Sequence, residues 1–173
     1  KGVRERTDEW RSEIKAPKRD GAIIMGVGVG GAGGNAVNHM WNLGIRGVTF
    51  LVCNTDQQAL DKSPVELKIR LGAEGLGAGN DPENGRRAAV ESLPEIRQHL
   101  EESGTRMLFI TAGLGGGTGT GAAPVIAQLA QEMGLLTVAL VPSPPAVRGK
   151  IRHEAAFQGT AELRPHLGSP LLI

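Results

Sequence analysis

Two glycine clusters constrain the fold of this chain more than any other feature of its sequence. They occupy residues 28–34 and 113–121, and 26 of the 173 residues are glycine. Each cluster follows a short apolar run, at residues 22–27 or 107–111, and precedes a helix-like stretch. Glycine has no Cβ atom, so its backbone can come close to another group. Glycines clustered between a strand and a helix therefore predict tight functional loops and argue against a flexible tract.

Strand-like and helix-like segments alternate along the chain from residue 22 onward. Expected strands lie at residues 22–27, 48–53, 65–71, 107–111, 136–141 and from 171. Expected helices lie at residues 35–43, 82–102, 122–133 and 150–163, with Pro94 interrupting the second and Pro124 in the first turn of the third. This order predicts an α/β fold in three layers, a Rossmann-like parallel sheet with helices on both faces. Ligands of such sheets bind at the carboxyl ends of the strands, where both glycine clusters fall.

The rest of the sequence predicts one domain and gives no signal for nucleic-acid binding, disulfide bonds, a metal site or a membrane span. Residues 1–20 are charged and aperiodic, so we expect a flexible N-terminal arm before a domain at residues 21–173. A net charge of +1 gives no electrostatic basis for nucleic-acid binding, and the single cysteine, Cys53, excludes a disulfide framework. The four histidines lack metal-ligand spacing, so no metal ligand is predicted. No apolar stretch approaches the roughly 20 residues that span a bilayer, so we expect a cytoplasmic protein without direct membrane insertion.

The first glycine cluster has the features of a phosphate-binding loop. It reads Gly28-Val29-Gly30-Gly31-Ala32-Gly33-Gly34-Asn35 and opens a helix. The N-terminus of a helix offers unpaired N–H groups and a partial positive charge. The same glycines also fit the G-x-G-x-x-G fingerprint of dinucleotide-binding domains, and Asp56 follows the second strand, where such a domain holds a ribose. This loop alone therefore leaves an NAD-binding Rossmann domain open.

The second cluster favours a triphosphate. Gly115-Gly116-Gly117-Thr118-Gly119-Thr120-Gly121 follows its own strand and opens its own helix. A dinucleotide-binding half needs one such loop, whereas two loops at one edge suit a triphosphate, and the threonine hydroxyls can donate to phosphate or approach Mg²⁺. Close helix–strand packing would explain one or two glycines but not five in seven positions. The chain has no G-x-x-x-x-G-K-[ST] P-loop.

A third glycine-bearing loop, Gly75-Leu76-Gly77-Ala78-Gly79-Asn80-Asp81-Pro82, leads into the second expected helix. Asn80 or Asp81 can cap that helix, and Pro82 suits its first turn. Helix capping is one interpretation of this loop. A third wall facing the phosphates is the other.

Four motifs, in order and spacing, resemble the tubulin/FtsZ family of cell-division GTPases. They are GVGGAGGNAV (residues 28–37), CNTDQQAL (53–60), GLGAGNDPENGR (75–86) and ITAGLGGGTGTGAAPV (110–125). The resemblance is close over residues 22–141. It implies a domain that binds GTP or GDP with Mg²⁺, polymerises head to tail, and hydrolyses GTP at subunit interfaces. It also implies other division-ring proteins as partners and a place at the mid-cell division ring.

Carried over by position, the resemblance predicts the nucleotide-binding residues. They are Gly30, Gly31, Ala32, Gly33, Gly34, Asn35, Asn54, Asp56, Gly77, Ala78, Gly79, Asn80, Gly115, Gly116, Gly117, Thr118, Gly119, Thr120 and Arg152. The resemblance weakens after Pro142, and Arg148 stands where the family has a ribose-contacting glutamate, a reversal of charge.

No catalytic residue is predicted within this chain. The family's acidic loop, which positions the attacking water, belongs to a second domain that we expect to be absent, with the C-terminal part of the GTP-binding domain truncated. Such a chain is expected to bind GTP better than it cleaves it. Two alternatives therefore remain beside the GTPase domain: a non-catalytic nucleotide-binding or filament-capping fragment and, more remotely, a Rossmann NAD-binding domain.

Overall fold

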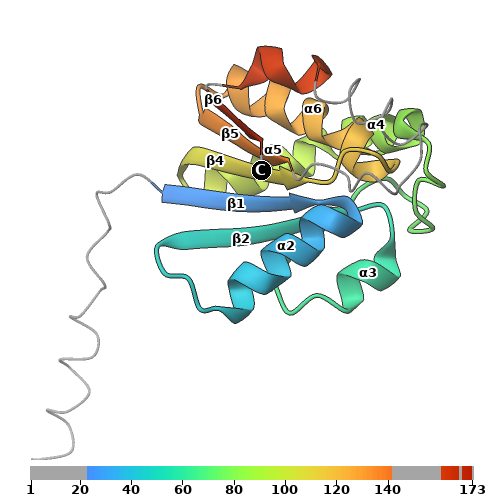
Figure 1. The fold of residues 1–173 in the computed structure, drawn as a ribbon, viewed down its shortest axis with the longest axis horizontal. Helices are drawn as coiled ribbons and strands as arrows, with labels where there is room; N and C mark the ends of the chain where they lie inside the picture. Colours follow the sequence, from blue (N-terminus) through green and yellow to red (C-terminus); the bar gives the residue numbers. More distant parts are fainter. Residues whose placement is uncertain (1–22, 142–160, 168, 173) are drawn as a thin grey trace, which may run out of the picture.

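The computed structural model describes residues 23–141, 161–167 and 169–172. Within these ranges the strands form one six-stranded sheet in the order β3-β2-β1-β4-β5-β6, with every neighbouring pair parallel (Figure 1). The strands are β1 (Ile23–Val29), β2 (Val48–Asn54), β3 (Leu67–Arg70), β4 (Thr105–Ala112), β5 (Leu136–Val141) and β6 (Ser169–Leu172). The helices are α2 (Gly30–Asn42), α3 (Gln57–Asp61), α4 (Pro82–Glu91), α5 (Leu93–Glu102), α6 (Thr118–Glu132) and the 3₁₀ turn η2 (Arg164–His166).

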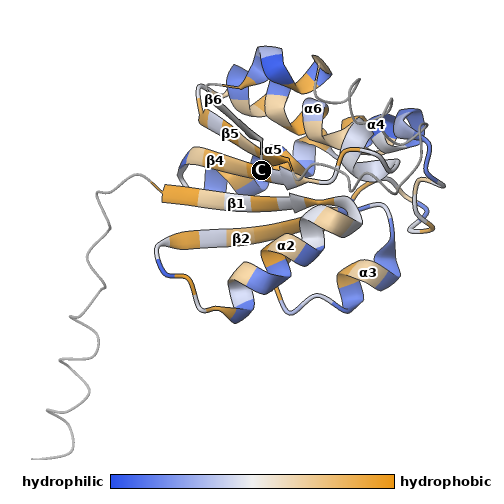
Figure 2. Cartoon of the chain, in the orientation of Figure 1, coloured by the Kyte–Doolittle hydropathy of each residue, from blue (hydrophilic) through white to orange (hydrophobic). Residues whose placement is uncertain are grey.

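The helices cover the sheet from both sides, which confirms the predicted α/β architecture. Helices α2 and α3 lie on one face, and α4, α5 and α6 lie on the other (Figure 1). Successive side chains of β2 point to opposite faces: Leu51 belongs to the core beneath α6, and Phe50 and Val52 to the smaller core beneath α2. Because both faces are buried, the strands are apolar along most of their length, whereas the outer sides of the helices are hydrophilic (Figure 2).

Both helices that follow a glycine cluster begin earlier than the sequence predicts. Helix α2 begins at Gly30, not at residue 35, and α6 begins at Thr118, not at residue 122. Pro124 is therefore inside α6 and not in its first turn, and it provides no N–H for the carbonyl of Thr120. The later glycines of each cluster therefore lie in the first turn or turns of a helix, so they serve close packing as well as loop geometry.

Two other segments also depart from the expected elements. The predicted long helix is divided at Ser92 into α4 and α5. Pro94 lies in the first turn of α5, so the predicted interruption of the helix near Pro94 is confirmed. Helix α3 was not predicted. It starts because the Asp56 carboxylate accepts hydrogen bonds from the N–H groups of Gln58 and Ala59.

Glycines bring α4 and α6 into backbone contact. A Cβ atom on Gly121 would overlap the carbonyl oxygen of Pro82 and lie 2.6 Å from the nitrogen of Arg86. A Cβ atom on Gly85 would likewise overlap the carbonyl oxygen of Gly117. This contact places the loop before α4 beside the loop before α6.

Several predictions fall outside the described residues. The expected arm at residues 1–20 lies there, as does most of the helix expected at residues 150–163, of which residues 161–163 are helical. None of the helices in the described ranges is long and apolar enough to cross a membrane.

The contact between α2 and β4 generates a stability prediction. A Cβ atom on Gly33 would overlap the carbonyl oxygen of Thr111, so we expect Gly33→Ala to destabilise the fold by about 3 kcal/mol. Gly34→Ala is the matched control in the same helix, because its Cβ atom would meet nothing within 4 Å. Alanine favours a helix over glycine by up to about 1 kcal/mol, so Gly34→Ala should keep or raise stability. Urea denaturation measures both variants, and equal stabilities would contradict the backbone contact.

Candidate functional site

Within the described ranges, the predicted site residues gather at one edge of the sheet. Strands β1, β2 and β4 end at Val29, Asn54 and Ala112, and they run parallel. The segments that follow them therefore share the carboxyl edge, on the side where α2 and α3 begin (Figure 1).

The first and second glycine clusters touch through their backbones. Gly30 has a φ of +75°, and a Cβ atom on it would lie 3.0 Å from the nitrogen of Gly119. A Cβ atom on Gly119 would overlap the carbonyl oxygen of Gly113 and lie 3.4 Å from that of Val29. A side chain at Gly30 would therefore press against the second cluster, and one at Gly119 would clash with the Gly113 carbonyl within its own cluster.

The third loop completes this group of segments. A Cβ atom on Gly117 would lie 2.8 Å from the nitrogen of Asp81 and 2.9 Å from the Cβ atom of Ala78. The loop is also tied to the segment after β2, because Gly77 N–H donates to the Thr55 carbonyl at 3.0 Å and Gln57 N–H donates to the Gly75 carbonyl at 3.0 Å. Left-handed backbone recurs along this loop, at Gly75, Gly77, Gly79 and Asn80.

The arrangement of helix starts suits an anion. The first N–H groups of a helix have no partner within the helix, and its dipole places partial positive charge there. Neither α2 nor α6 carries an acidic residue in its first turn, so no carboxylate competes for these groups. Several predicted site residues are exposed at this edge, namely Gly31, Ala32, Asn35, Gly77, Gly79 and Asn80.

The polar side chains after β2 organise their own segment. Asn54 is buried, and its Oδ1 accepts a hydrogen bond from Asp56 N–H at 3.2 Å. Asp56 Oδ1 accepts from Gln58 N–H at 2.9 Å and so caps α3. These bonds fix the loop, and contact of either side chain with a nucleotide stays a prediction.

The two threonines of the second cluster have different partners. Thr120 Oγ1 accepts a hydrogen bond from Gly115 N–H at 2.8 Å, which holds the turn before α6. Thr118 Oγ1 lies 2.6 Å from Thr55 Oγ1, and both side chains are buried. Thr55 is not among the predicted site residues, because only the fold brings residues 63 positions apart into contact.

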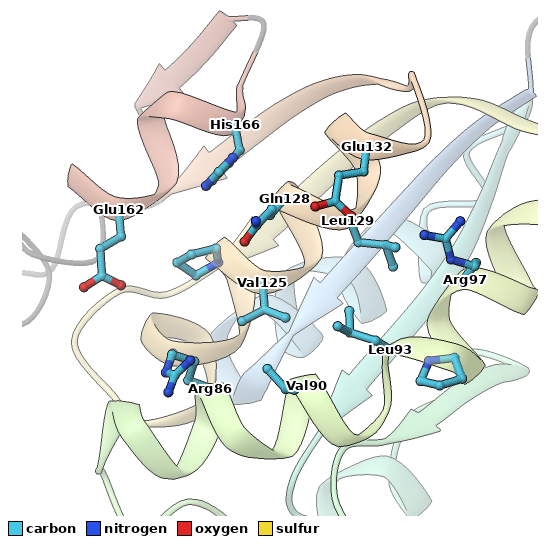
Figure 3. Close-up of a pocket in the computed structure, with 13 residues that line it drawn as sticks. Arg86, Val90, Leu93, Arg97, Val125, Gln128, Leu129, Glu132, Glu162 and His166 are labelled. Carbon is cyan, nitrogen blue, oxygen red and sulfur yellow. The ribbon is translucent and has the colours of Figure 1, made fainter.

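The cavities also distinguish this edge from the rest of the surface. A cavity of ≈ 320 Å³ beside α2 and α3 is lined by six predicted site residues, namely Gly30, Gly31, Gly34, Asn35, Asn54 and Asp56. A larger groove of ≈ 610 Å³ runs between α4, α5 and α6 and contains none of the predicted site residues (Figure 3). Its floor is apolar, with Val90, Leu93, Val125 and Leu129, and it reaches the glycine clusters only at Gly121, in the first turn of α6.

A divalent cation at this edge would need a bound phosphate to help coordinate it. In the described ranges no group of three or more His, Cys, Asp or Glu side chains could hold a metal ion. The segments do provide hydroxyl oxygens and the Asp56 carboxylate, which are oxygen ligands of the kind that Mg²⁺ takes. They fit Mg²⁺ that is held mainly by phosphate oxygens and water. Arg148 and Arg152 lie outside the described residues.

An open parallel sheet with three glycine-rich segments in backbone contact at its carboxyl edge defines a nucleotide-binding α/β domain. The family model of the tubulin/FtsZ family, GTPase domain, matches residues 23–173. The chain belongs to the tubulin/FtsZ family.

The relatives agree with this assignment. The cell division protein FtsZ of Porphyromonas gingivalis is 50% identical over 154 residues, which cover 87% of this chain and 34% of that protein. A solved structure of an empty FtsZ dimer from M. jannaschii matches with a TM-score of 0.86 and 38% identity over 98% of this chain and 48% of that one. A GTPγS-bound protofilament of CetZ2 from Haloferax volcanii matches with a TM-score of 0.78 and 26% identity, covering 87% of this chain and 48% of that one. The chain thus spans between a third and a half of the length of these relatives.

The buried cysteine gives a test of the geometry beneath the site. Cys53 is 1% exposed, and burial, aided by the charge of Glu95, raises the pKa of its thiol from 9.0 to about 12. Because the thiolate is the reactive form, we expect no labelling of the folded chain by iodoacetamide at pH 8, and complete labelling in urea. Mass spectrometry measures the modified fraction. Rapid labelling of the folded chain would contradict the position of Cys53 in the core.

Proposed function

We propose that this chain binds GTP and GDP at the carboxyl edge of its sheet, as the nucleotide-binding part of a tubulin-like cell-division GTPase. The observation that carries the proposal is the backbone contact between three glycine-rich segments, which leaves their N–H groups around one place. The starts of α2 and α6 carry no acidic residue in their first turns, which supports a polyphosphate ligand there.

Each segment has a distinct role in this proposal. The unpaired N–H groups at the start of α2, among them those of Gly31 and Ala32, and the N–H groups of Gly116 to Gly119 donate to phosphate oxygens from two sides. The exposed loop from Gly77 to Asn80 forms the third wall. Bound Mg²⁺ would neutralise phosphate charge, with Thr118 and Asp56 as the nearest candidates to hold it through oxygen. Arg152 is proposed to contact the nucleotide from the part of the chain outside the described residues.

The wider activity follows from the family and is likewise proposed. We infer that GTP is hydrolysed where two subunits meet head to tail in a filament, with no catalytic residue in this chain and the missing group supplied by a neighbour. The dimeric and protofilament structures of relatives support self-association. Partners would include other division-ring proteins, at mid-cell in the cytoplasm, without nucleic acid or direct membrane insertion.

The NAD-binding alternative has no observation in its favour that the GTP-binding proposal lacks. The strand order of this sheet is also that of Rossmann dehydrogenases, so topology does not separate the two. Asp56, the residue that would hold a ribose, instead uses Oδ1 to cap α3. The second glycine cluster also has no role in a single dinucleotide-binding loop.

Nucleotide binding by the purified chain tests the proposal directly. With Mg²⁺ present, we expect GTP and GDP to bind, ATP to bind more weakly and NAD not to bind. The proposed site holds a chain of phosphates, and the proteins of this family are GTPases. Isothermal titration calorimetry measures all four ligands. Binding of NAD alone, or of none of the four, would contradict the proposed function.

A variant places the ligand at the glycine loops. A Cβ atom on Gly116 would meet no atom within 4 Å, so the fold should accept Gly116→Ala with a stability change within about 0.5 kcal/mol. The added methyl group would stand where a phosphate must approach the backbone, and GTP affinity should fall about tenfold. Unchanged GTP affinity in this variant would place the nucleotide elsewhere.

A further inference from the structure

A buried pair of hydroxyl groups joins two of the segments at the site. Thr55 Oγ1 and Thr118 Oγ1 are 2.6 Å apart, and the two residues are 5% and 9% exposed. Thr118 is the first residue of α6, and Thr55 lies between β2 and α3. This pair is a direct side-chain bond between the second glycine cluster and the segment after β2.

The direction of this bond limits what Thr118 can do. A hydroxyl group has one proton to donate and two lone pairs to accept with. If Thr118 donates to Thr55, its proton is used inside the protein. If Thr55 donates to Thr118, the Thr118 proton remains free for another acceptor. An ionised phosphate oxygen accepts, so a hydrogen bond from the Thr118 hydroxyl to a phosphate is compatible with the second direction alone.

Thr55 is held in position from several sides. Its carbonyl accepts the Gly77 N–H at 3.0 Å, and its neighbours Asn54 and Asp56 are bonded to each other within the same segment. Its β-branched side chain has few accessible rotamers. The Thr55 hydroxyl therefore has a fixed place from which to donate.

We infer that Thr55 is a positioning residue for nucleotide binding: its hydroxyl donates to Thr118 Oγ1, so that Thr118 presents its own proton to a phosphate oxygen. This inference rests on the proposed function, because it needs a phosphate at the second glycine cluster. It assigns to Thr55 a part in ligand binding that is distinct from contact with the ligand. It also predicts that removal of the Thr55 hydroxyl weakens the binding of any ligand that carries these phosphates, whether or not the ligand has a base.

Three substitutions test the inference. Thr55→Val keeps the shape and removes the hydroxyl, and Thr55→Ser keeps the hydroxyl. Thr105→Val is the matched control, because Thr105 Oγ1 forms an equally short pair with Ser103 Oγ, 2.6 Å, at the opposite end of the sheet. Calorimetric titration of each variant with GTP, GDP and magnesium pyrophosphate gives the affinities, and thermal denaturation reports the fold.

We expect a loss of affinity that is the same for every ligand that carries the phosphates. Thr55→Val should weaken all three ligands by a similar factor of about ten, the scale of one hydrogen bond to a charged group. Thr55→Ser should stay within about threefold of the unsubstituted chain, and Thr105→Val should leave all affinities unchanged. If Thr55→Val does not fold, Thr55→Ala in its place removes the same donor.

Other results overturn the inference in distinguishable ways. Full affinity in Thr55→Val shows that the hydroxyl has no part in binding, while the proposed function stands. An equal loss in Thr105→Val, or a loss for GTP and GDP without one for pyrophosphate, assigns the effect to general stability or to the base. If the unsubstituted chain binds none of the three ligands, the proposed function itself fails, and the inference fails with it.

Discussion

The structure depends on backbone segments that approach one another without side chains between them. Gly33 lies against the carbonyl of Thr111, Gly119 against that of Gly113, and Gly121 against that of Pro82. The contacts of Gly33 and Gly121 join the start of a helix to another element, and that of Gly119 closes the turn before α6. A methyl group at Gly33 or Gly121 would separate elements that the fold holds together. The glycine clusters therefore have a structural role that does not depend on a ligand.

The same constraint creates the site. Bringing helix starts this close concentrates N–H groups and positive dipole ends at one edge, and the first turns of α2 and α6 contain no carboxylate to offset them. The polar side chains nearby are mostly engaged in holding the segments: Asp56 caps α3, Thr120 holds the turn before α6, and Thr118 is bonded to Thr55. A phosphate ligand would thus meet a preformed backbone surface with few side chains to rearrange.

The sequence predicted the layered parallel sheet and the edge that carries the site, because apolar runs and glycine clusters are local signals. It did not predict where the helices begin. Gly30 and Thr118 begin helices whose glycines pack against backbone that is distant in the sequence. Such contacts produce no recognisable pattern in the local sequence. Helix α3 was missed because it is only five residues long and depends on one capping carboxylate. The hydrogen bond between Thr55 and Thr118 and the close contact of Gly121 with the Pro82 carbonyl were both missed, because each joins residues far apart in the chain. The ligand roles of the individual site residues remain predictions.

The central claim is that three glycine-rich segments form one phosphate site, and backbone amide NMR tests it most directly. Titration of the ¹⁵N-labelled chain with GDP and Mg²⁺ should shift the amide signals of residues 31–35, 77–80 and 115–119 together, along one saturation curve. Residues that line the groove between α4, α5 and α6, such as Val90 and Leu129, should not shift. Shifts confined to a single loop, or centred on that groove, would contradict the claim.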